Sequence, residues 1–128
     1  MNWKAEATGK LRRYDTMYQA AENLSEELDQ LQVAENTPED ERLNGLVRQR
    51  ELEESLRQVR NWLQSVSRAL AALTPEEKLV LYRMHMYPEK GNVDRLCEEL
   101  GLEKSSVYRR RKRALRKFTI ALYGAEES

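Results

Sequence analysis

The sequence predicts an all-α fold, in which a long antiparallel helical hairpin with a heptad pattern precedes a group of shorter helices. The 128 residues include only five glycines and three prolines, the two residues that disfavour helix interiors most. Apolar residues recur at alternating spacings of three and four along two long stretches, which is the spacing of one helix face. Tracts rich in Glu, Gln, Arg, Leu and Ala also favour helix.

Two long helices are expected first. The earlier one should run from about Trp3 to Ala34, and the break Glu35-Asn36-Thr37-Pro38 follows it, with Thr37 as the cap of the next helix. The later one should run to about Leu73. The two seams consist of Tyr14, Met17, Ala21, Leu24, Leu28 and Leu31, and of Leu52, Leu56, Val59, Leu63, Val66, Leu70 and Leu73.

The short break predicts that the two long helices form an antiparallel hairpin over residues 1–73. Each helix has a single apolar seam, widened by Leu11 and Tyr18 in the first and by Trp62 and Ala69 in the second. Such a pair buries little surface, so we expect two hairpins to associate in a homodimer. The alternative is a monomer whose hairpin packs on its own C-terminal domain, residues 74–128.

A capping box marks the start of that second domain. Thr74 is the expected N-cap, Pro75 occupies the first helical position, and Glu77 completes the box. The helix should end near Tyr87, because the proline after Tyr87 disfavours helical backbone there. His85 is expected at the surface or at its boundary.

Two further helices follow, and their spacing predicts a helix-turn-helix. Asn92 should cap a short helix over Val93–Leu100, Gly101 should end it in the left-handed conformation, and the last helix should run from Lys104 to Tyr123. Small and apolar residues around the glycine would fill the space between the two helices. These residues are Leu96, Cys97, Leu100, Leu102 and Val107.

The charge distribution points to nucleic acid. Formal net charge is zero, but residues 1–73 carry 10 basic and 13 acidic residues, whereas residues 74–128 carry 12 and 9. The segment Lys104–Lys117 holds eight basic residues and no acidic one. Concentrated positive charge on one helix is typical of a nucleic-acid contact. The alternative is an ordinary solvated helix end.

Helical geometry divides the last helix into an apolar and a polar face. Val107, Ala114 and Phe118 should face inward, and Ser105, Arg109, Lys112 and Arg116 should form a polar stripe on the opposite side. Residues near the start of this helix would read bases in the major groove, and later ones would contact phosphates. The expected base readers are Ser105, Ser106, Tyr108 and Arg109; the expected phosphate contacts are Lys112, Arg113, Arg116 and Lys117; Lys104 could join either set.

About fifty C-terminal residues resemble a known family. Leu73-Thr74-Pro75-Glu76-Glu77, then 93–102 and 114–118, resemble region 4 of sigma-70-type factors. The ending 113–118 with 121–124 looks more like the RinA/ArpU-type regulators of phages and prophages. This resemblance implies a sigma-region-4-like fold, promoter DNA as the partner of the last helix, and control of phage late genes in a Gram-positive host. Glu103 departs from the pattern where a Ser or Thr cap is usual, and Arg110 where an apolar residue is usual.

The predicted function is therefore sequence-specific binding of double-stranded DNA in transcription regulation. One alternative is a phage small terminase-like packaging protein, which would form rings. Another is an adaptor that binds RNA polymerase through the heptad helices. An enzyme is not expected, because the sequence has no phosphate loop, no metal-ligand cluster and no nucleophile paired with a base.

The composition bears on the cellular compartment, on membrane spans and on cofactors. The single cysteine, Cys97, excludes a disulfide within the chain and fits a reducing compartment, so we expect the cytoplasm of a bacterial host cell. No apolar run approaches the roughly 18 residues that a membrane span needs, and no signal-peptide pattern is visible. No metal or other cofactor is expected, since there is one histidine and one cysteine.

Overall fold

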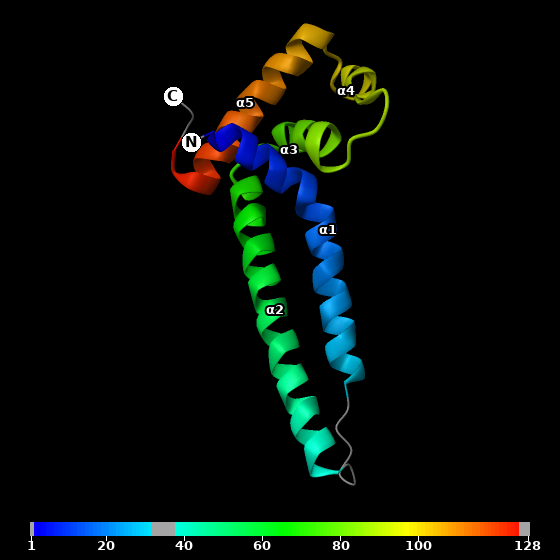
Figure 1. Cartoon of the computed structure of the whole chain (residues 1–128). Helices are drawn as coiled ribbons and strands as arrows, with labels where there is room; N and C mark the ends of the chain where they lie inside the picture. Colours follow the sequence, from blue (N-terminus) through cyan, green and yellow to red (C-terminus); the bar gives the residue numbers. More distant parts are fainter. Residues whose placement is uncertain (1, 32–37, 126–128) are drawn as a thin grey trace. The chain divides into compact units, whose positions relative to one another are not determined.

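The structure, a computed structural model, describes residues 2–31 and 38–125, and every regular element in these ranges is a helix (Figure 1). The prediction of an all-α protein is confirmed for this part of the chain. The elements in order are α1 (Trp3–Gln30), α2 (Glu39–Ala71), α3 (Pro75–Leu81), the π-helix η1 (Tyr82–Met86), α4 (Asn92–Leu100) and α5 (Lys104–Tyr123).

The long helices lie close to where the sequence places them. Helix α1 begins at Trp3 as predicted, while its expected end at Ala34 and the Thr37 cap lie outside the described residues. Helix α2 begins directly after Pro38, whose carbonyl accepts the first backbone hydrogen bond of the helix from Arg42, at 2.9 Å. It ends at Ala71, two residues before the predicted Leu73.

The chain forms two compact units. One, which we call the α5 unit, comprises Met1–Asp15 and Gln64–Ser128; the other, the two-helix unit, comprises Thr16–Leu63. These limits differ from the expected regions 1–73 and 74–128, because the start of α1 and the end of α2 pack within the α5 unit. Ala7, Leu11 and Val66 are all fully buried there.

Within the α5 unit, α3 and α4 pack against α5 around a shared apolar cluster. Val80 of α3, Leu96 of α4 and Val107 of α5 form its fully buried centre. Six partly buried side chains pack around this centre, among them the predicted Cys97, Leu100 and Leu102. The residues that the sequence placed between the two last helices therefore do pack together.

The ends of the short helices follow the expected local chemistry at two sites and differ at one. Thr74 caps α3 in a complete capping box: it accepts from the Glu77 backbone, and Glu77 accepts from the Thr74 backbone. Gly101 ends α4 with φ of 65°, the left-handed conformation that glycine adopts without strain. The prediction that Asn92 caps α4 is wrong, because Gly91 holds the cap position and the Asn92 side chain donates to the Arg83 carbonyl instead.

A π-helical turn follows α3, which the sequence did not predict. In η1 the backbone N–H of Tyr87 donates to the Tyr82 carbonyl five residues back, at 2.9 Å. The wider turn carries His85 into the interior, where only 6% of the residue is exposed. The expectation of a surface histidine is therefore wrong. Burial, followed by the charges of Arg111 and Arg12, lowers the pKa of His85 to about 4.

The two-helix unit contains residues 16–30 of α1 and 39–63 of α2, which run side by side in opposite directions (Figure 1). An ion pair between Arg48 and Glu27, at 2.9 Å, joins the two segments. Leu52 and Leu56 of α2 are buried in this unit. Three apolar side chains near the start of α2 remain about half exposed: Leu43 at 49%, Leu46 at 50% and Val47 at 58%.

The buried histidine predicts a defined pH dependence of stability. Because the pKa of His85 lies below the value of about 6.5 in the unfolded chain, the unfolded state takes up a proton first as the pH falls. The free energy of unfolding is unaffected by the titration of this histidine above about pH 6.5. Between pH 6.5 and 4 it falls, at up to about 1.4 kcal/mol per pH unit. Urea unfolding of the wild type and of His85→Gln between about pH 7.5 and 4.5 tests this, and parallel curves for the two proteins would contradict it.

Candidate nucleic-acid interface

The inner face of α5 anchors the helix in the core. Val107, Ala114 and Phe118 all have no exposed surface, which confirms the predicted inward face. Thr119, which the sequence did not single out, is also buried and donates its hydroxyl hydrogen bond to the Leu115 carbonyl at 2.6 Å. A fixed inner face determines which directions the remaining side chains of α5 take.

On one flank, the cations of α5 meet the acidic start of α3. Arg110 forms an ion pair with Glu76, and the Lys117 ammonium lies 2.9 Å from Glu77, whose side chain is only 11% exposed. These four side chains line a hollow between α3 and α5, and Arg113 lines it with them. Arg110 therefore makes an ionic contact with the start of α3.

Glu77 serves both the helix cap and this ionic contact. Burial raises its pKa, but the hydrogen bonds from the Thr74 backbone and the Lys117 ammonium more than offset that effect, and the pKa lies below its usual value. Glu77 therefore stays ionised at neutral pH and holds Lys117 against α3. Lys117, one of the predicted phosphate contacts, is therefore already paired with a mostly buried acid.

The outer face of α5 carries the predicted polar stripe. Ser105, Arg109, Lys112 and Arg116 are all exposed, and Tyr108 is nearly half exposed beside them. Arg109 donates to the Ser106 hydroxyl at 3.3 Å, so the two lie on neighbouring turns. Lys104, in the first turn, lies 3.7 Å from Asp94 in a pair that is exposed on both sides. Glu103 makes no side-chain cap, as its identity predicts.

On the other flank, the start of α1 and α5 enclose a cationic hollow of about 440 Å³, which we call the Lys4 hollow. The residues that line it are Lys4, Tyr108, Arg109, Arg111, Lys112 and Leu115, and none of these is acidic. The sequence prediction included Arg109 and Lys112 but missed Lys4 and Arg111. The position of Arg111 on the helix could have identified it as a lining residue. Lys4 is more than a hundred residues away in the sequence, so only the fold reveals that it lines the hollow.

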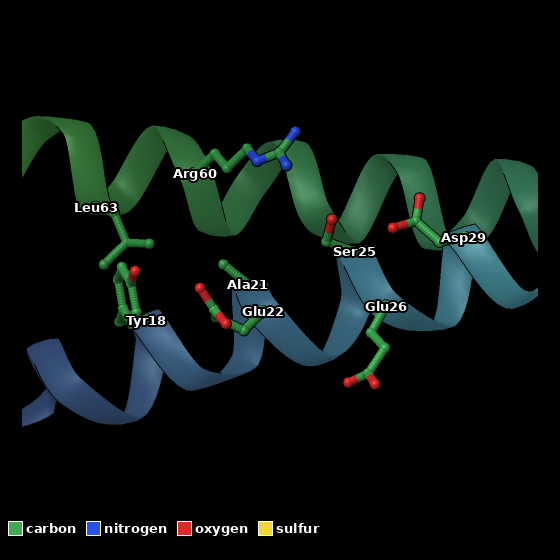
Figure 2. A pocket seen from close by; sticks show the side chains of 8 residues that line it. All are labelled: Tyr18, Ala21, Glu22, Ser25, Glu26, Asp29, Arg60 and Leu63. Atoms are coloured by element: carbon green, nitrogen blue, oxygen red, sulfur yellow. The ribbon is translucent and has the colours of Figure 1, made fainter.

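Another hollow, with mostly acidic charged residues in its lining, lies within the two-helix unit (Figure 2). It measures about 610 Å³, and Tyr18 and Leu63 face each other at one end. Glu22, Glu26 and Asp29 line it along α1, and Arg60 of α2 is the single cation among its lining residues. The excess of carboxylates would repel the phosphates of a nucleic acid, so this surface is not suited to bind DNA.

Neither a metal cluster nor a membrane-spanning helix occurs in the described ranges. Residues 2–31 and 38–125 contain no group of three or more His, Cys, Asp and Glu side chains placed to hold a metal ion. None of the helices in these ranges is long and apolar enough to cross a membrane.

Comparison of the chain with protein-family models, with curated proteins and with solved structures finds no match.

The paired cations on α5 should differ from the outer ones in their effect on stability. Replacement of Lys117 by Gln removes a charged hydrogen bond to a mostly buried carboxylate, so we expect the free energy of unfolding to fall by about 1 kcal/mol. Lys112→Gln removes the same charge from the exposed stripe and should change it by less than about 0.5 kcal/mol. Chemical unfolding of both variants measures the difference, and equal losses would mean that the Glu77 contact contributes nothing to stability.

Proposed function

We propose that the protein is a sequence-specific DNA-binding transcriptional regulator of the phage or prophage type. In this proposal, α4 and α5 act as a sigma-region-4-like helix-turn-helix, and α5 enters the major groove as the recognition helix. The two long helices act as a hairpin that brings two copies together. The resemblance to RinA/ArpU-type regulators is part of the proposal.

The observation that supports this function best is the separation of cations around α5. Arg110 and Lys117 are paired with acids of α3, whereas the Lys4 hollow on the other flank gathers cations with no acidic side chain among the lining residues. A cationic surface on a helix whose opposite face is fully buried is suited to a polyanion. In an ordinary solvated helix end, we would expect acids and bases to be mixed on both flanks.

The exposed residues fit two different tasks on DNA. Arg109, near the start of α5, could hold a guanine through two parallel hydrogen bonds, and Ser105, Ser106 and Tyr108 would lie against neighbouring bases. Lys112, one turn later, and Arg116 would contact phosphates and set the register. Because Lys117 is already paired with Glu77, its contact with a phosphate would be weaker than that of Lys112.

Dimerisation through residues 1–73 is the second part of the proposal. Within the two-helix unit, Leu52 and Leu56 are buried, while Leu43, Leu46 and Val47 are half exposed. A second hairpin would cover these exposed side chains and give a four-helix bundle. A dimer would also present two copies of α5, as dimeric DNA readers commonly do.

DNA binding by Arg109→Ala and Lys112→Ala tests the first part. The wild type should prefer a fragment from the promoter region upstream of its own gene over a scrambled competitor. Arg109→Ala should relax this preference, because a bidentate pair with a base contributes roughly 1–3 kcal/mol of discrimination. Lys112→Ala should weaken binding to both fragments alike, because phosphates carry no sequence information. Fluorescence anisotropy at two salt concentrations measures both effects.

Failure of this test has a specific meaning. If the wild type binds both fragments equally, with a steep salt dependence, the chain is a nonspecific DNA-tethered adaptor, and binding of RNA polymerase by the long helices becomes the function to examine. If Lys112→Ala loses the sequence preference and Arg109→Ala keeps it, the assignment of base reading to Arg109 is wrong.

The mass of the assembled protein tests the second part. Sedimentation equilibrium should give twice the chain mass of 15.1 kDa, and Leu46→Glu should shift the equilibrium toward the monomer by placing a charge on the apolar surface. A ring of many copies would support the terminase-like packaging function instead. A monomer at micromolar concentration would exclude the four-helix bundle.

A further inference from the structure

We propose that the Lys4 hollow is a binding site for a phosphodiester group of the DNA backbone, so that the first turn of α1 forms part of the DNA interface. This inference rests on the proposed DNA-binding function and adds a site to it. No residue outside α5 was expected to contact DNA from the sequence. The ligand chemistry that the hollow selects is a phosphate oxygen, which the DNA backbone or free inorganic phosphate could supply.

The lining of the hollow is dominated by cations. Four of its six lining residues are positively charged, and they come from two helices: Lys4 from α1, and Arg109, Arg111 and Lys112 from α5. Like charges in one hollow repel each other, and an anion bound among them would offset this repulsion. Guanidinium and ammonium groups are also strong donors to phosphate oxygens in proteins.

Arg111 has a donor that an anion in the hollow could satisfy. Its side chain is half buried, and its Nε–H is shielded from solvent with no hydrogen-bond partner among the described residues. The guanidinium lies 5.8 Å from the centroid of the Tyr108 ring, which also lines the hollow. A buried donor without an acceptor is costly, and a shift of the Arg111 side chain toward the hollow would let a phosphate oxygen supply the acceptor.

The positive charge of Arg111 acts on a neighbouring buried group. Burial and then the charge of Arg111 lower the pKa of His85, and Arg12 contributes further. The field of these cations therefore extends into the core of the α5 unit. An anion beside Arg111 would reduce that field, so the titration of His85 reports on occupancy of the hollow.

The first turn of α1 is held in place before any ligand arrives. The Trp3 ring packs on the Tyr123 ring with centroids 4.7 Å apart, and the Asn2 side chain accepts a hydrogen bond from the Ala5 backbone at 2.9 Å. Ala7, one turn further along, is fully buried. Lys4 thus reaches the hollow from an anchored helix end, and the positive end of the α1 dipole lies beside it.

Shared residues favour DNA as the source of the phosphate. Arg109 and Lys112 line the hollow and also belong to the exposed stripe that would face the major groove. A phosphate in the hollow would therefore belong to a strand bordering that groove. A free anion would need no such alignment with the recognition helix.

The test compares Lys4→Gln with Lys10→Gln in the full chain. Lys10 is on the same helix and carries the same charge, but its ammonium lies 4.7 Å from the centroid of the Tyr123 ring and does not line the hollow. The logarithm of the DNA affinity is measured against the logarithm of salt concentration, on cognate and scrambled fragments. Lys4→Gln should make the slope shallower by roughly 0.9, the contribution of one phosphate, and should weaken both fragments by the same factor. Lys10→Gln should leave the slope unchanged, and thermal melting verifies that both variants fold.

A second arm uses inorganic phosphate with the DNA-free protein, followed by NMR at the Arg111 Nε–H and the His85 ring. Phosphate should shift the Arg111 signal and raise the pKa of His85, and Lys4→Gln should weaken both effects several-fold. These readouts do not depend on DNA binding.

The outcomes separate this inference from the proposed function. A wild-type slope in Lys4→Gln, with sequence preference still lost in Arg109→Ala, would overturn the inference and leave the regulator intact. Phosphate binding that depends on Lys4, in a protein that binds no DNA, would overturn the DNA assignment together with the proposed function. If neither DNA nor phosphate bound, both proposals would fall.

Discussion

Burial of one face of α5 is the constraint on which the rest of the α5 unit depends. Val107 joins Val80 of α3 and Leu96 of α4 in one fully buried cluster, and Ala114 and Phe118 extend the contact along α5. Close packing allows a helix little rotation about its own axis, so each cation on α5 takes a defined direction. A basic helix with a weaker apolar face would present the same charges without a fixed orientation.

The acids at the start of α3 then divide the cations of α5 into two groups. Glu77 completes the capping box of α3 and, in the same position, holds Lys117, while Glu76 holds Arg110. One short segment therefore starts a helix, positions it against α5 and pairs two of the three cations on that flank of the basic helix. The opposite flank gathers cations without an acid among them, and the functional proposal depends on that asymmetry.

The start of α1 brings side chains from a distant part of the sequence to the surface of α5. Trp3 packs on Tyr123 near the end of α5, and the same first turn brings Lys4 to the hollow beside Arg111. Nearby, the widened turn η1 buries His85 without a hydrogen-bond partner among the described residues. π-Helical turns occur frequently at functional sites, and here the turn places a titratable group within the field of Arg111.

Local chemistry determined much of this protein from its sequence: the helical class, the Thr74 capping box, the Gly101 turn and the inner face of α5 at Val107 all depend on residues near one another along the chain. The expected DNA contacts rest on that same periodicity and remain a prediction. Tertiary structure decided what periodicity does not contain, namely which side chains from distant segments meet. It paired Lys117 with Glu77, placed Lys4 beside α5 and buried His85, because such contacts depend on how helices pack and not on spacing within one helix.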